Sequence, residues 1–224
     1  MRSVALFIPA RLESSRLPRK LVLPFAGTTI IDIALAKLHE VQFPCQKYFL
    51  AWHTELIEKN VYDDVETIVR SNDSAVCDGP LTRSFADLKS VKQDYLMFLN
   101  PCLTMLRPST IDSALEKFSK IEAKSMTSVI LHKNWFFNAE TRECLTDINY
   151  KELNSKHTVP VYSFANSFHI GLKDKLFRSG KFLDQDTVLF PIPYHQAYDV
   201  NDPSDIRVAE ALYQSRERIW SYEK

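Results

Sequence analysis

Apolar runs of strand length alternate with amphipathic segments of helical length along the whole chain. Runs of apolar residues predict strands over 4–9, 47–52, 65–69, 95–99, 125–132, 159–164 with 168–170, and 188–190. Apolar residues at helical spacing predict helices over 29–41, 54–61, 80–91, 108–121 and 203–220, with a short helix after 172. This alternation predicts an α/β fold, in which a mostly parallel sheet of six or seven strands carries helices on both faces.

Two of these runs, 4–9 and 95–99, are apolar on both faces, as central parallel strands covered by helices would be. Ligands of open α/β sheets bind at the carboxyl ends of the strands. The loops after Ile8, Leu99 and Tyr198 are therefore the places where we expect chemistry.

The length of 224 residues suits one domain spanning 1–224. The segment 133–160 is less regular, because Trp135, Phe136 and Phe137 are followed by a polar stretch. We expect this segment to be an excursion over the sheet or an arm that pairs with a second copy of the chain.

Composition excludes several classes of nucleotide-binding protein. The chain has only 4 glycines, at 27, 79, 171 and 180, so neither a G-x-G-x-x-G turn nor a G-x-x-x-x-G-K loop can be written. The 28 Lys+Arg balance the 28 Asp+Glu, which gives no global electrostatic reason to expect a nucleic-acid or membrane partner. The four cysteines are dispersed and the apolar run at 4–9 is too short for a signal segment, so we expect a cytoplasmic protein with reduced thiols.

The loop after the first strand concentrates positive charge. Arg11, Arg16, Arg19 and Lys20 lie within ten residues, with Glu13 as the one acid among them. Guanidinium and ammonium groups bind phosphate oxygens, and hydroxyls and backbone N–H groups in the same turn add donors. The loop is thus either a polyphosphate site or a solvated basic loop.

Three segments resemble one family, the CMP-sugar-acid synthetases, which include CMP-Kdo synthetases and acylneuraminate cytidylyltransferases. The first is Ile8-Pro9-Ala10-Arg11, a four-residue spacer and Arg16-Leu17-Pro18-x-Lys20. The loop 100–108 is similar to the family's Q-P-T-S-P-L-R segment. The stretch 198–205 followed by 209–212 is similar to its closing D-I-D-T-P-E-D…A-E-A-L.

The resemblance implies a three-layer, Rossmann-like nucleotidyltransferase that moves CMP from CTP to an acidic sugar and releases pyrophosphate, with Mg²⁺. It implies a homodimer in surface polysaccharide or lipopolysaccharide biosynthesis. By position it makes Arg11 and Lys20 catalytic. It assigns nucleotide binding to Ala10, Arg11, Ser14, Ser15, Arg16, Lys20, Arg70, Ser71 and Asn100. It assigns the acceptor to Lys156, Tyr162 and Asn166, and the metal to Asp199 and Asn201.

The chain also departs from the family pattern. Asn201 stands where an aspartate is usual, the loop 100–103 has no acid, and the glycine expected after Asn166 is missing. Asp199 could instead be a turn or cap residue, and Asp202 or Asp205 is expected to cap the last helix. Two other functions therefore stay open: a non-catalytic homologue that binds nucleotide as a partner subunit, and an enzyme for a different nucleotide or acceptor.

Overall fold

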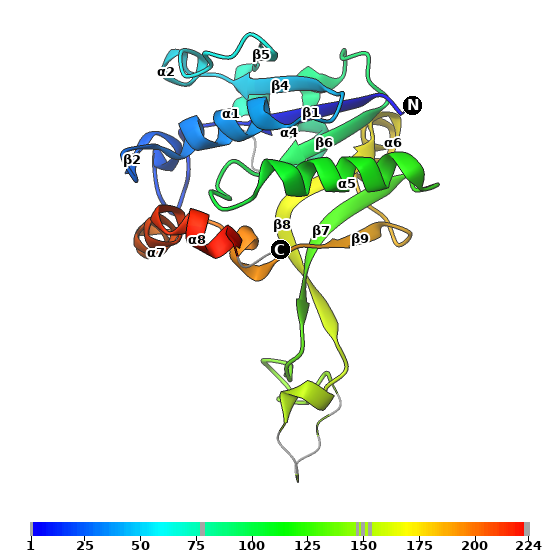
Figure 1. Cartoon of the computed structure of the whole chain (residues 1–224). Helices are drawn as coiled ribbons and strands as arrows, with labels where there is room; N and C mark the ends of the chain where they lie inside the picture. Colours follow the sequence, from blue (N-terminus) through cyan, green and yellow to red (C-terminus); the bar gives the residue numbers. More distant parts are fainter. Residues whose placement is uncertain (1, 77–78, 147, 149–150, 152–153, 222–224) are drawn as a thin grey trace.

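A computed structural model describes residues 2–76, 79–146, 148, 151 and 154–221. Its main sheet has seven strands in the order β5-β4-β1-β6-β8-β7-β9 (Figure 1). Among the described strands of this sheet, β8 alone runs antiparallel to its neighbours. The strands are β1 (Val4–Pro9), β4 (Gln46–Ala51), β5 (Val65–Val69), β6 (Tyr95–Leu99), β7 (Ser125–His132), β8 (Val161–Leu172) and β9 (Val188–Pro191). A short hairpin pairs β2 (Pro24–Phe25) with β3 (Thr28–Thr29).

Helices cover both faces of the sheet because alternate residues of its strands point to opposite sides. On β1, Leu6 and Ile8 join a core with α1 (Ile30–Glu40) and α5 (Pro108–Lys120), whereas Ala5 and Phe7 join a core on the other face. That second core contains residues of the 3-10 helix η2 (Ala86–Leu88) and of α6 (Lys173–Ser179). The expected three-layer α/β architecture is confirmed.

Two of the helices predicted from the sequence are each divided into two shorter helices. The predicted helix 80–91 is divided into α4 (Leu81–Ser84) and η2, and the predicted helix 203–220 into α7 (Pro203–Gln214) and α8 (Arg216–Ser221). Phe85 separates α4 from η2 and is buried in the second core. The other helices are η1 (Lys20–Val22), α2 (Thr54–Ile57), α3 (Asn72–Ala75), η3 (Ser155–His157) and η4 (Tyr194–Ala197). Among the described residues, no helix has the length and apolar character needed to cross a membrane.

The segment 133–160 lies at the end of an arm. Beyond the body of the sheet, β7 and β8 continue as a two-stranded ribbon, pairing Val129 with Phe164 and His132 with Val161 (Figure 1). The described part of its tip includes a bridge between Phe137 and Cys144 and the helix η3. The described part of the segment therefore extends away from the body and does not fold over the sheet.

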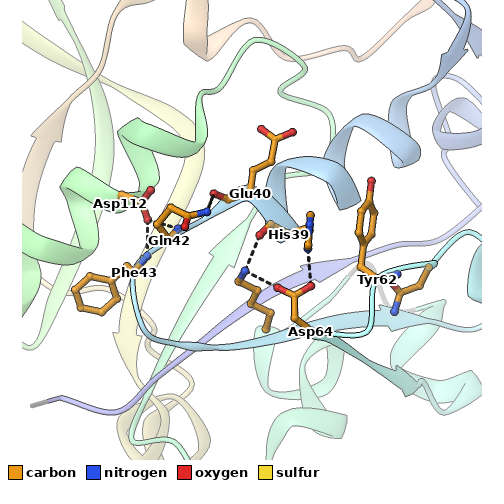
Figure 2. Close-up of polar contacts among 9 residues, drawn as sticks. His39, Glu40, Gln42, Phe43, Tyr62, Asp64 and Asp112 are labelled. Atoms are coloured by element: carbon orange, nitrogen blue, oxygen red, sulfur yellow. Dashed lines mark hydrogen bonds and ion pairs between the residues drawn. The ribbon is translucent and has the colours of Figure 1, made fainter.

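A polar network fixes the connection from α1 to β4 at the amino end of the parallel strands (Figure 2). The Lys47 ammonium, almost fully buried, donates to the Asp64 carboxylate at 2.7 Å and to the His39 carbonyl at 2.8 Å. The Asp112 carboxylate accepts from the backbone N–H groups of Gln42 and Phe43 at 2.9 and 2.8 Å. These contacts fix the chain at the amino ends of the parallel strands. The loops identified from the sequence lie at the carboxyl ends.

Lys37 is a buried cation inside the predicted apolar face of α1. Its ammonium donates to the Leu103 carbonyl in the loop after β6. Burial lowers the pKa of Lys37 to about 7, although Cys102 and Glu40 oppose the shift. A charged residue among the apolar positions of 30–38 was the only sequence signal for this contact.

Replacing Lys37 by Met is expected to make stability less dependent on pH. Between about pH 7 and 10 the unfolded chain keeps a proton on Lys37 that the folded chain has released, so the unfolding free energy of the wild type rises with pH. The slope from this one group is at most about 1.4 kcal/mol per pH unit. Lys37→Met should therefore be relatively more stable than wild type at pH 6 and lose most of that advantage by pH 9, in urea unfolding.

Lys120→Met is the matched control, because Lys120 lies exposed at the end of α5 beside Glu116. Its stability difference from wild type should not change with pH. A Lys37→Met difference equally independent of pH would contradict the buried, titrating ammonium.

Candidate nucleotide-binding cleft

A cleft of about 370 Å³ opens at the carboxyl ends of β1 and β6. It lies between the loop that follows β1 and the segment that precedes α7. Four cations and a single carboxylate are among the described residues that line it. Ten of the residues proposed from the sequence line it together: Arg11, Ser14, Ser15, Arg16, Lys20, Arg70, Asn100, Asn166, Asp199 and Asn201.

The basic loop is held in shape by its own backbone. The Ala10 N–H donates to the Leu50 carbonyl at 2.8 Å, and the Arg19 N–H donates to the Leu12 carbonyl at 2.8 Å. Leu12 and Leu17 are buried and anchor the loop to the core, and Ala10 lies buried beneath it. Arg19 has a φ of 60°, in the left-handed region, where the chain reverses before η1. The loop therefore projects its polar side chains around the cleft.

Two ion pairs tie the outside of this loop to the chain after β4. His53 contacts the Glu13 carboxylate at 2.5 Å, and the Arg19 guanidinium contacts the Glu55 carboxylate at 2.6 Å. Arg19 thus points toward α2, and the other three cations of the loop line the cleft. Sequence reasoning missed both pairs, because nothing local to the loop indicates that the chain after β4 lies beside it.

Asp199 places a carboxylate at the floor of the cleft. Its Oδ2 accepts from the Asn100 side chain at 3.3 Å, and its Oδ1 is buried without a hydrogen-bond partner among residues 2–76, 79–146, 148, 151 and 154–221. Burial raises the pKa of this carboxyl, and Lys20 is the strongest opposing influence. The Lys20 ammonium donates to the Val200 carbonyl at 2.7 Å. An unpartnered buried carboxylate oxygen is costly, so Asp199 is poised to accept a cationic ligand.

The segment after Asp199 caps the next helix. Asp202 and Asp205 form a reciprocal capping box at the start of α7. Asp199 is therefore not part of the cap of this helix. The Asn201 N–H donates to Asp205 at 2.8 Å, and the Asn201 side-chain oxygen accepts from Arg16 at 2.7 Å. The expectation that Asp202 or Asp205 caps the helix is confirmed for both.

The residues around Asp199 suit a metal ion only if the ion arrives already bound to a ligand. In the part of the chain that the structure describes, no three His, Cys, Asp or Glu side chains cluster in a manner that would hold a metal. Mg²⁺ is usually bound by one or two carboxylates together with substrate phosphates and water. Asp199 Oδ1 therefore suits a Mg²⁺ ion that arrives on a polyphosphate, and does not suit a metal held by the protein alone.

A bulge in β8 brings Asn166 to the cleft. The β7 residues 127 and 129 pair with 169 and 164 of β8, so the residues between them on β8 loop outward. The buried Ser128 hydroxyl accepts from the N–H groups of Ser167 and Phe168, both at 3.1 Å. Asn166 has a φ of 51°, in the left-handed region, which asparagine adopts more readily than most residues. Bulges beside active sites commonly redirect a side chain in this way.

An aromatic pocket of about 350 Å³ adjoins the cleft. We use this name for the space lined by Leu81, Phe85, Phe98, Phe164, Asn166, His169, Phe182 and Leu183. The His169 ring stacks on Phe98 and Phe164 and contacts the Asn166 side-chain oxygen at 3.1 Å. Burial lowers the pKa of His169 to about 4, so the ring is neutral at pH 7. Phe85, Phe98, Leu81 and Asn166 line both spaces, which makes the two continuous.

Four residues proposed from the sequence are not among the described residues that line the cleft: Ala10, Ser71, Lys156 and Tyr162. Ala10 is buried beneath the basic loop. Ser71 caps α3 by accepting from the Ser74 N–H. Lys156 belongs to η3 and Tyr162 to the start of β8, both on the arm, so neither is among the described residues lining the cleft of the same chain. Arg70 lines the cleft, but its guanidinium is buried and donates to the Ser74 and Ser84 carbonyls.

Comparison with known proteins identifies the family. The family model described as cytidylyltransferase matches residues 5–220. Pseudaminic acid cytidylyltransferases of two Campylobacter jejuni strains, of serotypes O:2 and O:23/36, are each 21% identical over 218 residues, which cover 92% of this chain and 94% of the relative.

Solved structures share the fold. A CMP:2-keto-3-deoxy-manno-octonic acid synthetase complexed with CTP superposes with a TM-score of 0.69 at 16% identity, covering 95% of this chain and 99% of that one. A 4-diphosphocytidyl-2C-methyl-D-erythritol synthase from Anaerococcus prevotii gives 0.66 at 12% identity, with coverage of 95% and 99%. Since the family model spans nearly the whole chain, this protein belongs to the cytidylyltransferase family and is a nucleotidyltransferase.

Proposed function

We propose that this chain transfers the cytidylyl group of CTP to an acidic sugar and releases pyrophosphate. The observation that carries the proposal is the Asp199 carboxylate, buried with one unpartnered oxygen, facing three cations of a single loop. The curated relatives are named for pseudaminic acid and one structural neighbour for 2-keto-3-deoxy-manno-octonic acid, and both names denote acids.

The reaction requires positioning and charge neutralisation more than covalent participation by the protein. An acceptor hydroxyl attacks the α-phosphorus, the bond from the α-phosphorus to the bridging β-phosphate oxygen breaks, and pyrophosphate leaves with the electron pair. The hydroxyl proton is released to solvent. Arg11 and Lys20 neutralise the triphosphate, and Arg16, Ser14 and Ser15 supply further donors to it. Asn100 keeps the Asp199 carboxylate oriented through its 3.3 Å hydrogen bond.

We further propose that Mg²⁺ is the metal. When bound between Asp199 and the triphosphate oxygens, it would neutralise part of the charge on the phosphates. The support is the unpartnered Oδ1 of Asp199 and the absence of other carboxylates among the described residues that line the cleft.

The aromatic pocket is the proposed place of the acceptor. Its phenylalanine and leucine side chains cannot form hydrogen bonds with the hydroxyl groups of a sugar, and burying hydroxyl groups without hydrogen bonds costs free energy. It suits an acidic sugar that carries an apolar substituent, such as the methyl group of an acylamido function. Asn166 lies where this pocket meets the nucleotide cleft and can orient the acceptor between them.

The arm supports the proposal of a homodimer. Phe137, Leu145, Val159 and Tyr162 on the arm are exposed apolar side chains, and a second copy would cover them. Lys156 and Tyr162 can contact an acceptor only if the arm of a second copy reaches the cleft, because both lie far out on the arm of their own chain.

Arg11→Ala and Lys20→Ala are each expected to reduce pyrophosphate release at least about 100-fold, as removal of one group that stabilises a charged transition state typically does. Arg19→Ala is the matched control: it lies in the same loop but pairs with Glu55, and should change release less than about twofold. Wild-type rates in Arg11→Ala and Lys20→Ala would contradict the assignment. Tight CTP binding by a wild type that never releases pyrophosphate would favour the non-catalytic alternative.

A panel of acceptors tests the substrate. Pyrophosphate release with CTP should be at least about tenfold faster with an N-acylated nine-carbon sugar acid than with Kdo, which has no acyl group, and undetectable with a neutral sugar phosphate. Phe164→Ala should reduce the preference for the acylated acid, while Tyr194→Ala, which alters an exposed aromatic in η4, should not. A preference for the neutral sugar phosphate would overturn the proposed acceptor class.

A further inference from the structure

Asn201 uses its side-chain oxygen on an arginine. The Arg16 guanidinium donates to Asn201 Oδ1 at 2.7 Å, although the two residues are 185 positions apart in the chain. The Asn201 side-chain nitrogen lies 3.5 Å from the Asp199 carbonyl, and the Asn201 N–H donates to Asp205. The side-chain amide is therefore contacted at both its oxygen and its nitrogen, with the oxygen directed at Arg16, and the backbone of the residue is fixed separately.

This contact leaves little room for Asn201 as a metal ligand. A Mg²⁺ ion bound to the same oxygen would lie about 2.1 Å from it. The guanidinium nitrogen, 2.7 Å from that oxygen, would then repel the ion at short range. Asn201 thus differs from Asp199, whose Oδ1 has no partner among the described residues.

Both sides of the contact are anchored independently. The basic loop is held by its own backbone hydrogen bonds and by the buried Leu12 and Leu17. The Asn201 backbone is fixed by the capping box at the start of α7. The backbones that carry Arg16 and Asn201 are therefore both fixed by the fold, and the hydrogen bond to Asn201 directs the exposed Arg16 guanidinium.

We infer that Asn201 is a positioning residue for Arg16, which it directs into the cleft beside Asp199 as a cation for the triphosphate. The neutral amide is essential to this role. It accepts the guanidinium hydrogen bond and leaves the full positive charge available to phosphate, whereas a carboxylate would neutralise that charge. This inference rests on the proposed binding of a nucleoside triphosphate and is independent of the acceptor.

A double-mutant cycle tests it with wild type, Arg16→Met, Asn201→Asp and the double variant. Two probes are used: Mn²⁺ without nucleotide, followed by the electron paramagnetic resonance signal of the free ion, and CTP without metal, followed by calorimetry in EDTA. Asn201→Asp should bind Mn²⁺ as weakly as wild type, which offers the ion a single carboxylate, because the new carboxylate pairs with Arg16. The double variant, with two unpaired carboxylates, should bind Mn²⁺ at least about tenfold more tightly than wild type.

Metal-free CTP should bind about tenfold more weakly to Arg16→Met and to Asn201→Asp, because each removes or neutralises the same positive charge. Asn201→Gln retains a neutral amide and should bind CTP more tightly than Asn201→Asp. Arg19→Met, whose guanidinium pairs outside the cleft, is the matched control and should bind CTP as wild type does. Thermal unfolding of each variant separates loss of binding from loss of folding.

Tenfold tighter Mn²⁺ binding by Asn201→Asp alone would overturn the inference, because the residue would then face the metal and not Arg16. Unchanged CTP affinity in Arg16→Met would overturn it as well. If wild type bound no CTP at all, the proposed function would fail. The Mn²⁺ measurements would still decide whether the Arg16 guanidinium pairs with the side chain at position 201.

Discussion

The buried carboxylate of Asp199 is the constraint on which the cleft depends. Burial raises the pKa of this carboxyl, and its buried charge destabilises the empty protein unless nearby cations compensate for the lost hydration. The charges of Lys20 and Arg16, on the loop after β1, lower the pKa of this carboxyl, and Asn100 donates a hydrogen bond to it from the loop after β6. The floor of the cleft is thus formed only when the carboxyl ends of β1 and β6 meet the segment before α7, which ties the charge distribution to the fold itself.

The two ends of the parallel strands have different roles: contacts at the amino ends stabilise the fold, and the loops at the carboxyl ends form the cleft. At the amino edge, the Lys47–Asp64 pair is satisfied by protein groups alone and fixes the connection between α1 and β4. At the carboxyl edge, positive charge exceeds negative charge among the described residues lining the cleft, and one carboxylate oxygen has no protein partner. Such an imbalance is unfavourable in the empty protein and favourable once an anion that carries a cation is bound.

Much of this arrangement could be predicted from the sequence because its determinants are local. The alternation of apolar runs predicts the layers, and the motif from Ile8 to Lys20 predicts a phosphate-binding loop at a strand end. The position of the arm, the ties from Glu13 to His53 and from Arg19 to Glu55, and the contact of Arg16 with Asn201 could not be predicted. Each depends on which distant segments become neighbours, and the β8 bulge at Asn166 depends on the buried Ser128 of the adjacent strand.

Calorimetry of CTP binding with and without Mg²⁺ shows whether Asp199 receives the metal together with the nucleotide. If it does, Mg²⁺ should tighten CTP binding to wild type at least about tenfold and have no such effect on Asp199→Asn. Asp199→Asn should still bind metal-free CTP at least as well as wild type, because it has lost one negative charge. An equal Mg²⁺ enhancement in wild type and Asp199→Asn would show that Asp199 does not bind the metal.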